Sequence, residues 1–156
     1  MASIRVQTAD FDVSAELAAL GAGRQDIGGY GIFVGTVRGN AHGHAISAMT
    51  LEHYPAMTER AMARIAAEAE RRWDLLGCTL IHRVGVLLPG ENIVLVLAAS
   101  AHRQAALDAA AFLIDWLKTA APFWKKERFA SGEDNWVDAR EADDAAAARW
   151  GALTAS

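Results

Sequence analysis

Cysteine is almost absent from this chain, which has one, Cys78, among 156 residues. A single cysteine excludes an internal disulfide and a four-cysteine zinc site. Cys78 follows Gly77 at the start of an apolar run, and no second cysteine forms a C-x-x-C pattern with it. We therefore interpret Cys78 as a buried small hydrophobic residue rather than as a reactive thiol.

Long hydrophobic runs are also missing. No stretch of about 18 apolar residues could cross a membrane, and the start of the chain lacks the basic-then-apolar pattern of a signal peptide. We therefore expect a cytoplasmic protein with no membrane partner. A chain of 156 residues, 53% of them hydrophobic, has the size of one domain. We predict a single domain over residues 1–156, with a C-terminal tail from about residue 141.

Complete nucleotide-binding and metal-binding motifs are absent as well. The run "GGYGIFVGTVRG" at 28–39 has the spacing GxGxxxG rather than GxGxxG, and no GKS or GKT occurs. Its glycines favour a strand with a bulge or a close backbone contact. His42 and His44 alternate as two ligands on a strand would, but no HExxH, CxxC or grouped carboxylate completes a ligand set. We predict neither a metal nor a cofactor.

Strand and helix patterns do alternate along the chain. We expect strands at 3–7, 28–39, 46–54, 79–88, 93–100 and 123–129, and helices at 12–21, after Pro55, at 101–120 and at 141–150. The strands at 28–39 and 46–54 flank a polar glycine-containing loop, so we expect them to form a hairpin. The pattern predicts an α+β fold with mostly antiparallel strands.

Positive charge gathers in one place although the net charge is −4. The net charge argues against a nucleic-acid partner. Lys118, Lys125, Lys126 and Arg128 nevertheless lie close together in the sequence. A local basic cluster fits a small anionic ligand better than a polyanion.

The run "SAHRQ" predicts an anion site at the start of the long helix. With Ser100 as the N-cap, His102 and Arg103 fall in the first turn, where the helix dipole already favours an anion. A bound phosphate or carboxylate would explain cationic groups there. The alternative is that both side chains face solvent or pair with an acid elsewhere.

Lys118 lies sixteen residues beyond His102, which is about 24 Å along a straight helix. One protomer therefore cannot place both on one small ligand. Either there are two sites, or one site is shared across a homodimer, which we favour. Taken alone, Lys118 also fits a lysine that complements a helix C-terminus, and Lys125 an exposed strand residue.

Seven runs, in order, resemble the catalytic, large subunit of molybdopterin synthase. They are "GTVRG", "TLEHYPAMTE", "IHRVG", "PGE", "SAHR", "LKTAAPFWKKE" and "WVDAR". The similarity extends from about residue 28 to Trp150, whereas the first thirty residues match poorly. Ala120 departs from the family's pattern, which has arginine before "APFWK". The resemblance implies an α/β hammerhead fold with an additional antiparallel β subdomain.

The resemblance also implies a sulfurtransferase of molybdenum cofactor biosynthesis. In this family a small ubiquitin-like sulfur-carrier subunit brings a C-terminal Gly-Gly thiocarboxylate. The large subunit binds cyclic pyranopterin monophosphate, and two sulfurs are added to form the dithiolene of molybdopterin. The family's assembly is a heterotetramer, a central homodimer with one small subunit at each end.

The family's motifs assign ten site residues in this chain. Lys118 and Lys125 are the implied catalytic residues, with Lys118 nearest the chemistry. The implied substrate-binding residues are Thr36, Val37, Arg38, His102, Arg103, Lys126, Glu127 and Arg140. We expect the apolar residues Pro122, Phe123 and Trp124 to form a wall that fixes where the lysines point.

Two other functions also fit the sequence. One is a stand-alone enzyme that forms a Schiff base between a lysine and a phosphorylated carbonyl compound. The other is a non-catalytic scaffold subunit that binds an anion or a pterin.

Overall fold

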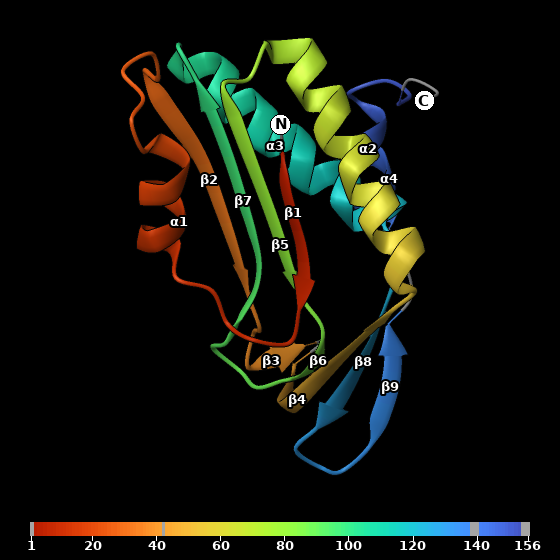
Figure 1. Ribbon diagram of the computed structural model, residues 1–156. Helices are drawn as coiled ribbons and strands as arrows, with labels where there is room; N and C mark the ends of the chain where they lie inside the picture. Colours follow the sequence, from red (N-terminus) through yellow and green to blue (C-terminus); the bar gives the residue numbers. More distant parts are fainter. Residues whose placement is uncertain (1, 42, 138–140, 154–156) are drawn as a thin grey trace.

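The computed structural model describes residues 2–41, 43–137 and 141–153 (Figure 1). The elements follow in the order β1 (Ser3–Gln7), α1 (Val13–Gly21), β2 (Gly29–Thr36), β3 (Asn40–Ala41), β4 (His44–His53), α2 (Pro55–Trp73), β5 (Gly77–Arg83), β6 (Gly85–Leu87), β7 (Asn92–Ser100), α3 (Arg103–Ala120), β8 (Phe123–Phe129), β9 (Asp134–Val137) and α4 (Glu141–Ala148). The predicted α+β class is confirmed. None of the described helices is both long and apolar enough to span a membrane.

The main sheet has four strands in the order β1-β5-β7-β2. β1 runs parallel to β5, and the other two pairings are antiparallel. Helices α2 and α3 pack on one face of this sheet, and the short helix α1 lies on the other (Figure 1). β2 is an edge strand.

Alternating side chains of the central strands build a core on each face of the main sheet. Cys78 and Leu80 of β5 point toward α2 and α3, where they join a cluster that includes Met62 and Phe112. Ile81 and its neighbours on β7 point the other way, toward α1. Cys78 is 1% exposed, and burial raises the pKa of its thiol to about 12. Its predicted place in the core is confirmed.

A second sheet lies below the first in Figure 1 and has the order β3-β4-β8-β9, with β6 also paired to β4. All its pairings are antiparallel. This is the additional antiparallel sheet that the family resemblance implies. Met49 and Leu51 of β4 form a small core with Val37 and Leu87.

The predicted hairpin between the strands at 28–39 and 46–54 is wrong. β2 pairs with β7, and β4 pairs with β8 and β6, so the two consecutive strands belong to different sheets. β2 passes directly beneath α3, so closely that a Cβ at Gly31 would clash with the carbonyl oxygen of Ala106. The glycines of this strand therefore serve close backbone contact, one of the two roles predicted for them.

Several element boundaries also differ from the prediction, among them the following two. The strand expected at 79–88 divides into β5 and β6, because Gly85, with φ +90°, turns the chain from the main sheet into the second. Helix α3 starts at Arg103 rather than after Ser100, which is the last residue of β7. The Ser100 hydroxyl still accepts a hydrogen bond from the backbone N–H of His102, at 3.3 Å.

The C-terminal segment packs against the main core. The indole N–H of Trp150 donates to Asp115 of α3 at 2.8 Å, and Arg149 pairs with the same carboxylate at 3.2 Å. The Trp150 ring lies edge-on to Trp73 and Phe112. These contacts hold α4 beside α3, at the end of α3 that faces the second sheet (Figure 1).

Candidate active site

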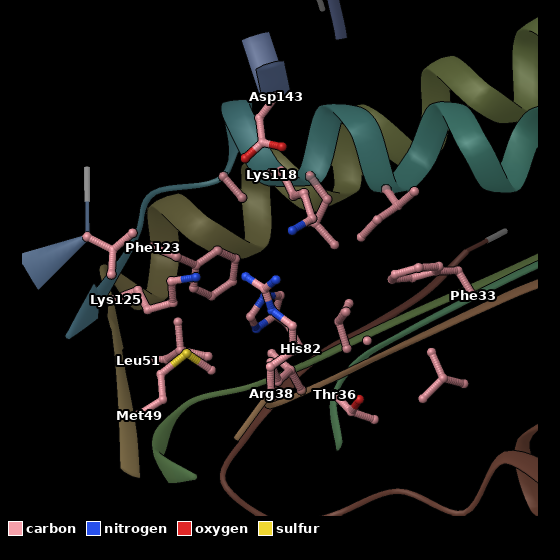
Figure 2. Close-up of a pocket in the computed structure, with 18 residues that line it drawn as sticks. Phe33, Thr36, Arg38, Met49, Leu51, His82, Lys118, Phe123, Lys125 and Asp143 are labelled. Atoms are coloured by element: carbon pink, nitrogen blue, oxygen red, sulfur yellow. The ribbon is translucent and has the colours of Figure 1, made fainter. Parts of the chain in front are cut away.

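A cavity of about 490 Å³ lies where the two sheets meet (Figure 2). Residues of eight elements line it, namely β2, β4, β5, β7, α3, β8, β9 and, through Asp143, α4. A smaller cavity of about 260 Å³ shares Thr36, Arg38, Lys118 and Lys125 with it. The two form one continuous candidate site.

Three cationic side chains line both cavities, each from a different part of the fold. Arg38 follows β2, Lys118 lies in the last turn of α3, and Lys125 lies on β8. Figure 2 shows the amine of Lys118 directed into the open space, with Lys125 and Arg38 on other sides of it. Cations that converge from separate elements make a binding site for a small anion.

Two carboxylates accompany the three cations. Asp143 of α4 lines both cavities, and Glu127 of β8, which is 7% exposed, lines the smaller one. The cations outnumber these carboxylates, so the lining keeps an excess of positive charge.

The rest of the larger cavity is mainly apolar. Its walls include Phe33, Met49, Leu51, Ile114 and Phe123. Apolar walls exclude water and lower the local dielectric constant, which strengthens the attraction between the cations and an anionic ligand.

His82 is a buried histidine in the cavity wall. Its ring stacks on Phe123, with centroids 3.8 Å apart and planes 19° apart. Its Nδ1 lies 2.8 Å from the backbone carbonyl oxygen of Arg83. Burial lowers the pKa of His82 to about 4, and the positive charge of Lys118 acts in the same direction. The ring is therefore neutral at pH 7.

Comparison with known proteins decides which family has this site. A sequence model described as the MoaE protein family matches residues 6–120. The molybdopterin synthase catalytic subunit of Mesorhizobium japonicum is 57% identical over 149 residues, which are 95% of this chain and 92% of that protein. The catalytic subunit of Ralstonia nicotianae is 55% identical over 154 residues, 99% of this chain and 87% of that protein.

The chain belongs to the molybdopterin synthase catalytic subunit family.

A solved structure of the same family agrees with the fold. The molybdopterin biosynthesis MoaE protein from Burkholderia ambifaria superimposes with a TM-score of 0.83 at 53% identity, covering 97% of this chain and 99% of that one. The similarity to the molybdopterin synthase family therefore extends well before residue 28. The expected start of the similarity at about residue 28 is therefore wrong.

The structure brings six of the ten residues assigned by the family's motifs to the cavities. They are Thr36, Val37, Arg38, Lys118, Lys125 and Glu127. Residues as far apart in the sequence as Thr36 and Glu127 lie together here, because β2 and α3 end, and β8 begins, where the two sheets join.

Three assigned residues lie elsewhere, and one lies outside the described residues. Lys126 is on the opposite face of β8 from Lys125, with its ammonium nitrogen 5.4 Å from the centroid of the Trp136 ring. His102 and Arg103 are exposed at the far end of α3 from Lys118. Arg140 is outside the residues that the structure describes.

The expected apolar wall is only partly present. Phe123 lines the cavity, but Trp124 points to the opposite face of β8, where the centroid of its ring lies 4.6 Å from the centroid of the Tyr54 ring. Successive residues of a strand alternate between faces, so Phe123, Lys125 and Glu127 share one side and Trp124 and Lys126 the other. Ala120, the departure from the family pattern, is the last residue of α3 and packs partly buried against the main core.

Sequence reasoning missed His82 and Asp143. His82 has the same strand parity as Cys78 and Leu80, so it occupies a core-facing position of β5. A histidine in that row was the available signal. Asp143 belongs to the acidic C-terminal stretch, which gave no sign that it would turn back over α3.

Proposed function

We propose that this cavity is the active site of a sulfurtransferase that adds two sulfurs to cyclic pyranopterin monophosphate and so forms the dithiolene of molybdopterin. The protein is then the catalytic subunit of molybdopterin synthase in molybdenum cofactor biosynthesis. The observation that carries the proposal is the convergence of Lys118, Lys125 and Arg38 on one apolar-walled cavity.

The charges of the reactants suit this cavity. The substrate carries a cyclic phosphate, and the sulfur donor is an anionic thiocarboxylate. Each sulfur addition also moves negative charge onto a departing oxygen, so fixed cations stabilise the transition state more than the ground state. In our account Lys118 donates the hydrogen bond to that oxygen, Lys125 assists it, and Arg38 holds the anionic end of the substrate.

The sulfur must come from a partner. Cys78, the chain's one cysteine, is 1% exposed, and burial raises the pKa of its thiol to about 12. Such a thiol is neither accessible nor ionised, so it cannot carry sulfur to the cavity. A small carrier subunit with a C-terminal Gly-Gly thiocarboxylate is the partner, because a tail without side chains can enter a cavity of this size.

His102 and Arg103 join the site from a second copy of the chain. β2 is the edge strand of the main sheet, and Tyr30 and Ile32 on it are 37% and 45% exposed. Antiparallel pairing of this edge with a second copy, about an axis near Ile32, would set Gly29 of one copy opposite Thr36 of the other. A Cβ on Gly29 would lie 3.7 Å from the Cα of Arg103, so the first turn of α3 would approach the second copy's cavity.

The first turn of α3 suits an anion. It contains no acidic residue, and its cap residue, His102, makes no side-chain capping hydrogen bond. The backbone N–H groups of this turn and the side chain of Arg103 can therefore hold phosphate. A mixed-protomer experiment tests the sharing: a His102→Ala chain and a Lys118→Ala chain, each inactive alone, should regain activity after subunit exchange. Mixtures that stay as inactive as their parents would refute it.

Reconstitution tests the function itself. The protein is mixed with thiocarboxylated carrier and cyclic pyranopterin monophosphate, and dithiolene product is quantified by mass spectrometry. The control uses carrier that ends in an ordinary carboxylate. Product that depends on the thiocarboxylate supports the proposal, whereas carrier binding without product favours the scaffold alternative. Trapping of substrate on a lysine by borohydride, without carrier, would favour the Schiff-base alternative.

We place this reaction in the cytoplasm and expect no nucleic-acid partner.

A further inference from the structure

His82 is a polar residue in a row of otherwise apolar, core-facing residues on β5. On the face of β5 that meets α2 and α3, Cys78 and Leu80 lie in the core, and His82 follows them at 9% exposure. The row ends at the cavity, which His82 lines together with Lys118 and Phe123 (Figure 2). A histidine so deeply buried needs a hydrogen-bonding role for both ring nitrogens.

The surroundings decide which nitrogen carries the proton. Nδ1 lies 2.8 Å from the Arg83 carbonyl oxygen, and a carbonyl oxygen can only accept. Nδ1 is therefore the donor, and in a neutral ring Nε2 is left with a lone pair. Within the part of the chain that the structure describes, the hydrogen bond of Nδ1 is the only one that the His82 ring makes, so Nε2 is available at the cavity that His82 lines. Stacking on Phe123 fixes the plane of the ring, so this acceptor has a set direction.

A neutral acceptor is the group that the three cations cannot supply. Arg38, Lys118 and Lys125 all donate hydrogen bonds, and they suit the anionic parts of a substrate. A reduced pterin also presents ring N–H donors, which need acceptors. Burial lowers the pKa of His82, and the positive charge of Lys118 adds to this effect, so the neutral acceptor persists at physiological pH.

We propose that His82 contacts the substrate, with Nε2 accepting a hydrogen bond from a ring N–H of the pyranopterin. This assignment rests on the proposed function and deepens it. It makes His82 a binding residue that fixes the orientation of the pterin, while the cations hold phosphate and the reacting oxygens.

Amide substitutions separate the two ring nitrogens. In His82→Asn the amide nitrogen can replace Nδ1 as donor to Arg83, but no acceptor remains at the place of Nε2. In His82→Gln the longer side chain can set its carbonyl oxygen near that place. His82→Phe keeps the stacked ring on Phe123 and lacks both nitrogens, and it replaces the asparagine variant if that one does not fold.

The experiment measures equilibrium binding of cyclic pyranopterin monophosphate and, separately, of the unmodified carrier, by titration calorimetry. We expect His82→Asn to weaken pterin binding about fivefold, which corresponds to one lost neutral hydrogen bond, with carrier affinity unchanged. His82→Gln should recover part of the loss. Thermal unfolding of each variant verifies that it is folded at the temperature of the titration.

Wild-type pterin affinity in both His82→Asn and His82→Phe would overturn the assignment. A parallel loss of pterin and carrier affinity in every variant, glutamine included, would also overturn it, because that pattern is expected of a packing residue. Failure of the wild-type protein to bind the pterin at all would contradict the proposed function itself, so the two failures are distinguishable.

Discussion

Lys125 and Lys126 are adjacent residues of one type on opposite faces of β8, and they form a matched pair for mutagenesis. Lys125 lines the cavity, whereas Lys126 lies over the Trp136 ring. We expect Lys125→Ala to lower kcat/KM about tenfold or more, because it removes a cation from the reacting groups. Lys126→Ala should stay within about twofold of wild type in the same steady-state assay. Equal losses in the two variants would contradict the geometry.

Cys78 should be chemically silent in the folded protein. Its thiol is buried, and its pKa is raised to about 12 by that burial, so iodoacetamide should modify it only after unfolding in urea. Mass spectrometry of treated protein measures this directly. Cys78→Ala should keep full thiocarboxylate-dependent activity. Loss of sulfur transfer in a folded Cys78→Ala protein would mean that the chain itself carries sulfur.

His82 should make stability depend on pH. Its folded pKa of about 4 lies below the ordinary value of 6.5, so the unfolded chain takes up the proton first as the pH falls. The free energy of unfolding should therefore decrease from pH 6.5 toward pH 4, by about 2 kcal/mol between pH 7 and pH 5. Carboxyls with lowered pKa, such as Asp10, act below this window because their ordinary value is 3.8.

Urea unfolding at pH 7 and pH 5 measures this dependence. The decrease should shrink in His82→Asn and persist in His102→Asn, because His102 is exposed. An unchanged decrease in His82→Asn would show that other groups cause it.

The sequence predicts the structural position of some residues better than that of others. Cys78 was predictable, because a lone cysteine opening an apolar run nearly always lies in a core. Six of the ten residues assigned by the family's motifs line the cavities, among them Lys118 and Lys125. The motifs did not distinguish Lys125 from Lys126. Only the alternation of side chains along a strand shows that these two lysines point to opposite faces of β8. His82 needed the tertiary structure, because its role depends on where β5 ends.

At the scale of elements, β2 governs the predicted assembly. It is an edge strand with exposed apolar side chains, which is an unusual surface for a monomer. We expect Ile32→Lys to convert the homodimer to monomers in analytical ultracentrifugation and to lower activity, because each cavity would lose the first turn of the second copy's α3. Val86→Lys, on β6 and 67% exposed, is the control and should leave the dimer intact. A dimer unaffected by Ile32→Lys would place the interface elsewhere.

Most elements were predictable from periodicity, and their partners were not. The strands at 3–7 and 123–129 have the predicted bounds, and Asp12 caps α1 by accepting from the backbone N–H of Ala15 at 3.0 Å. The hairpin prediction failed because the rule of local pairing ignores α3. β2 is drawn under that helix by packing that involves residues more than seventy positions away, such as Ala106.

At the scale of the whole molecule, the cavity lies at the junction of two sheets that differ in strand order, where side chains leave a space between the sheets unfilled. β2 ends there, α3 delivers Lys118 there, and β8 begins there (Figures 1 and 2). The order of secondary elements predicted an α+β fold, but it could not predict this junction, which depends on the turn at Gly85 and on the change of sheet after Thr36. The candidate site is thus a property of the sheet arrangement rather than of any one motif.

A single-turnover measurement on Lys118→Ala tests most directly whether sulfur transfer takes place in this cavity. Preformed complexes of wild-type and variant protein with thiocarboxylated carrier are mixed with cyclic pyranopterin monophosphate, and dithiolene formation is followed by mass spectrometry. Carrier affinity is measured in parallel. We predict that the variant forms product about a hundredfold more slowly or worse at unchanged carrier affinity. Product formation at the wild-type rate would mean that sulfur transfer does not take place in this cavity.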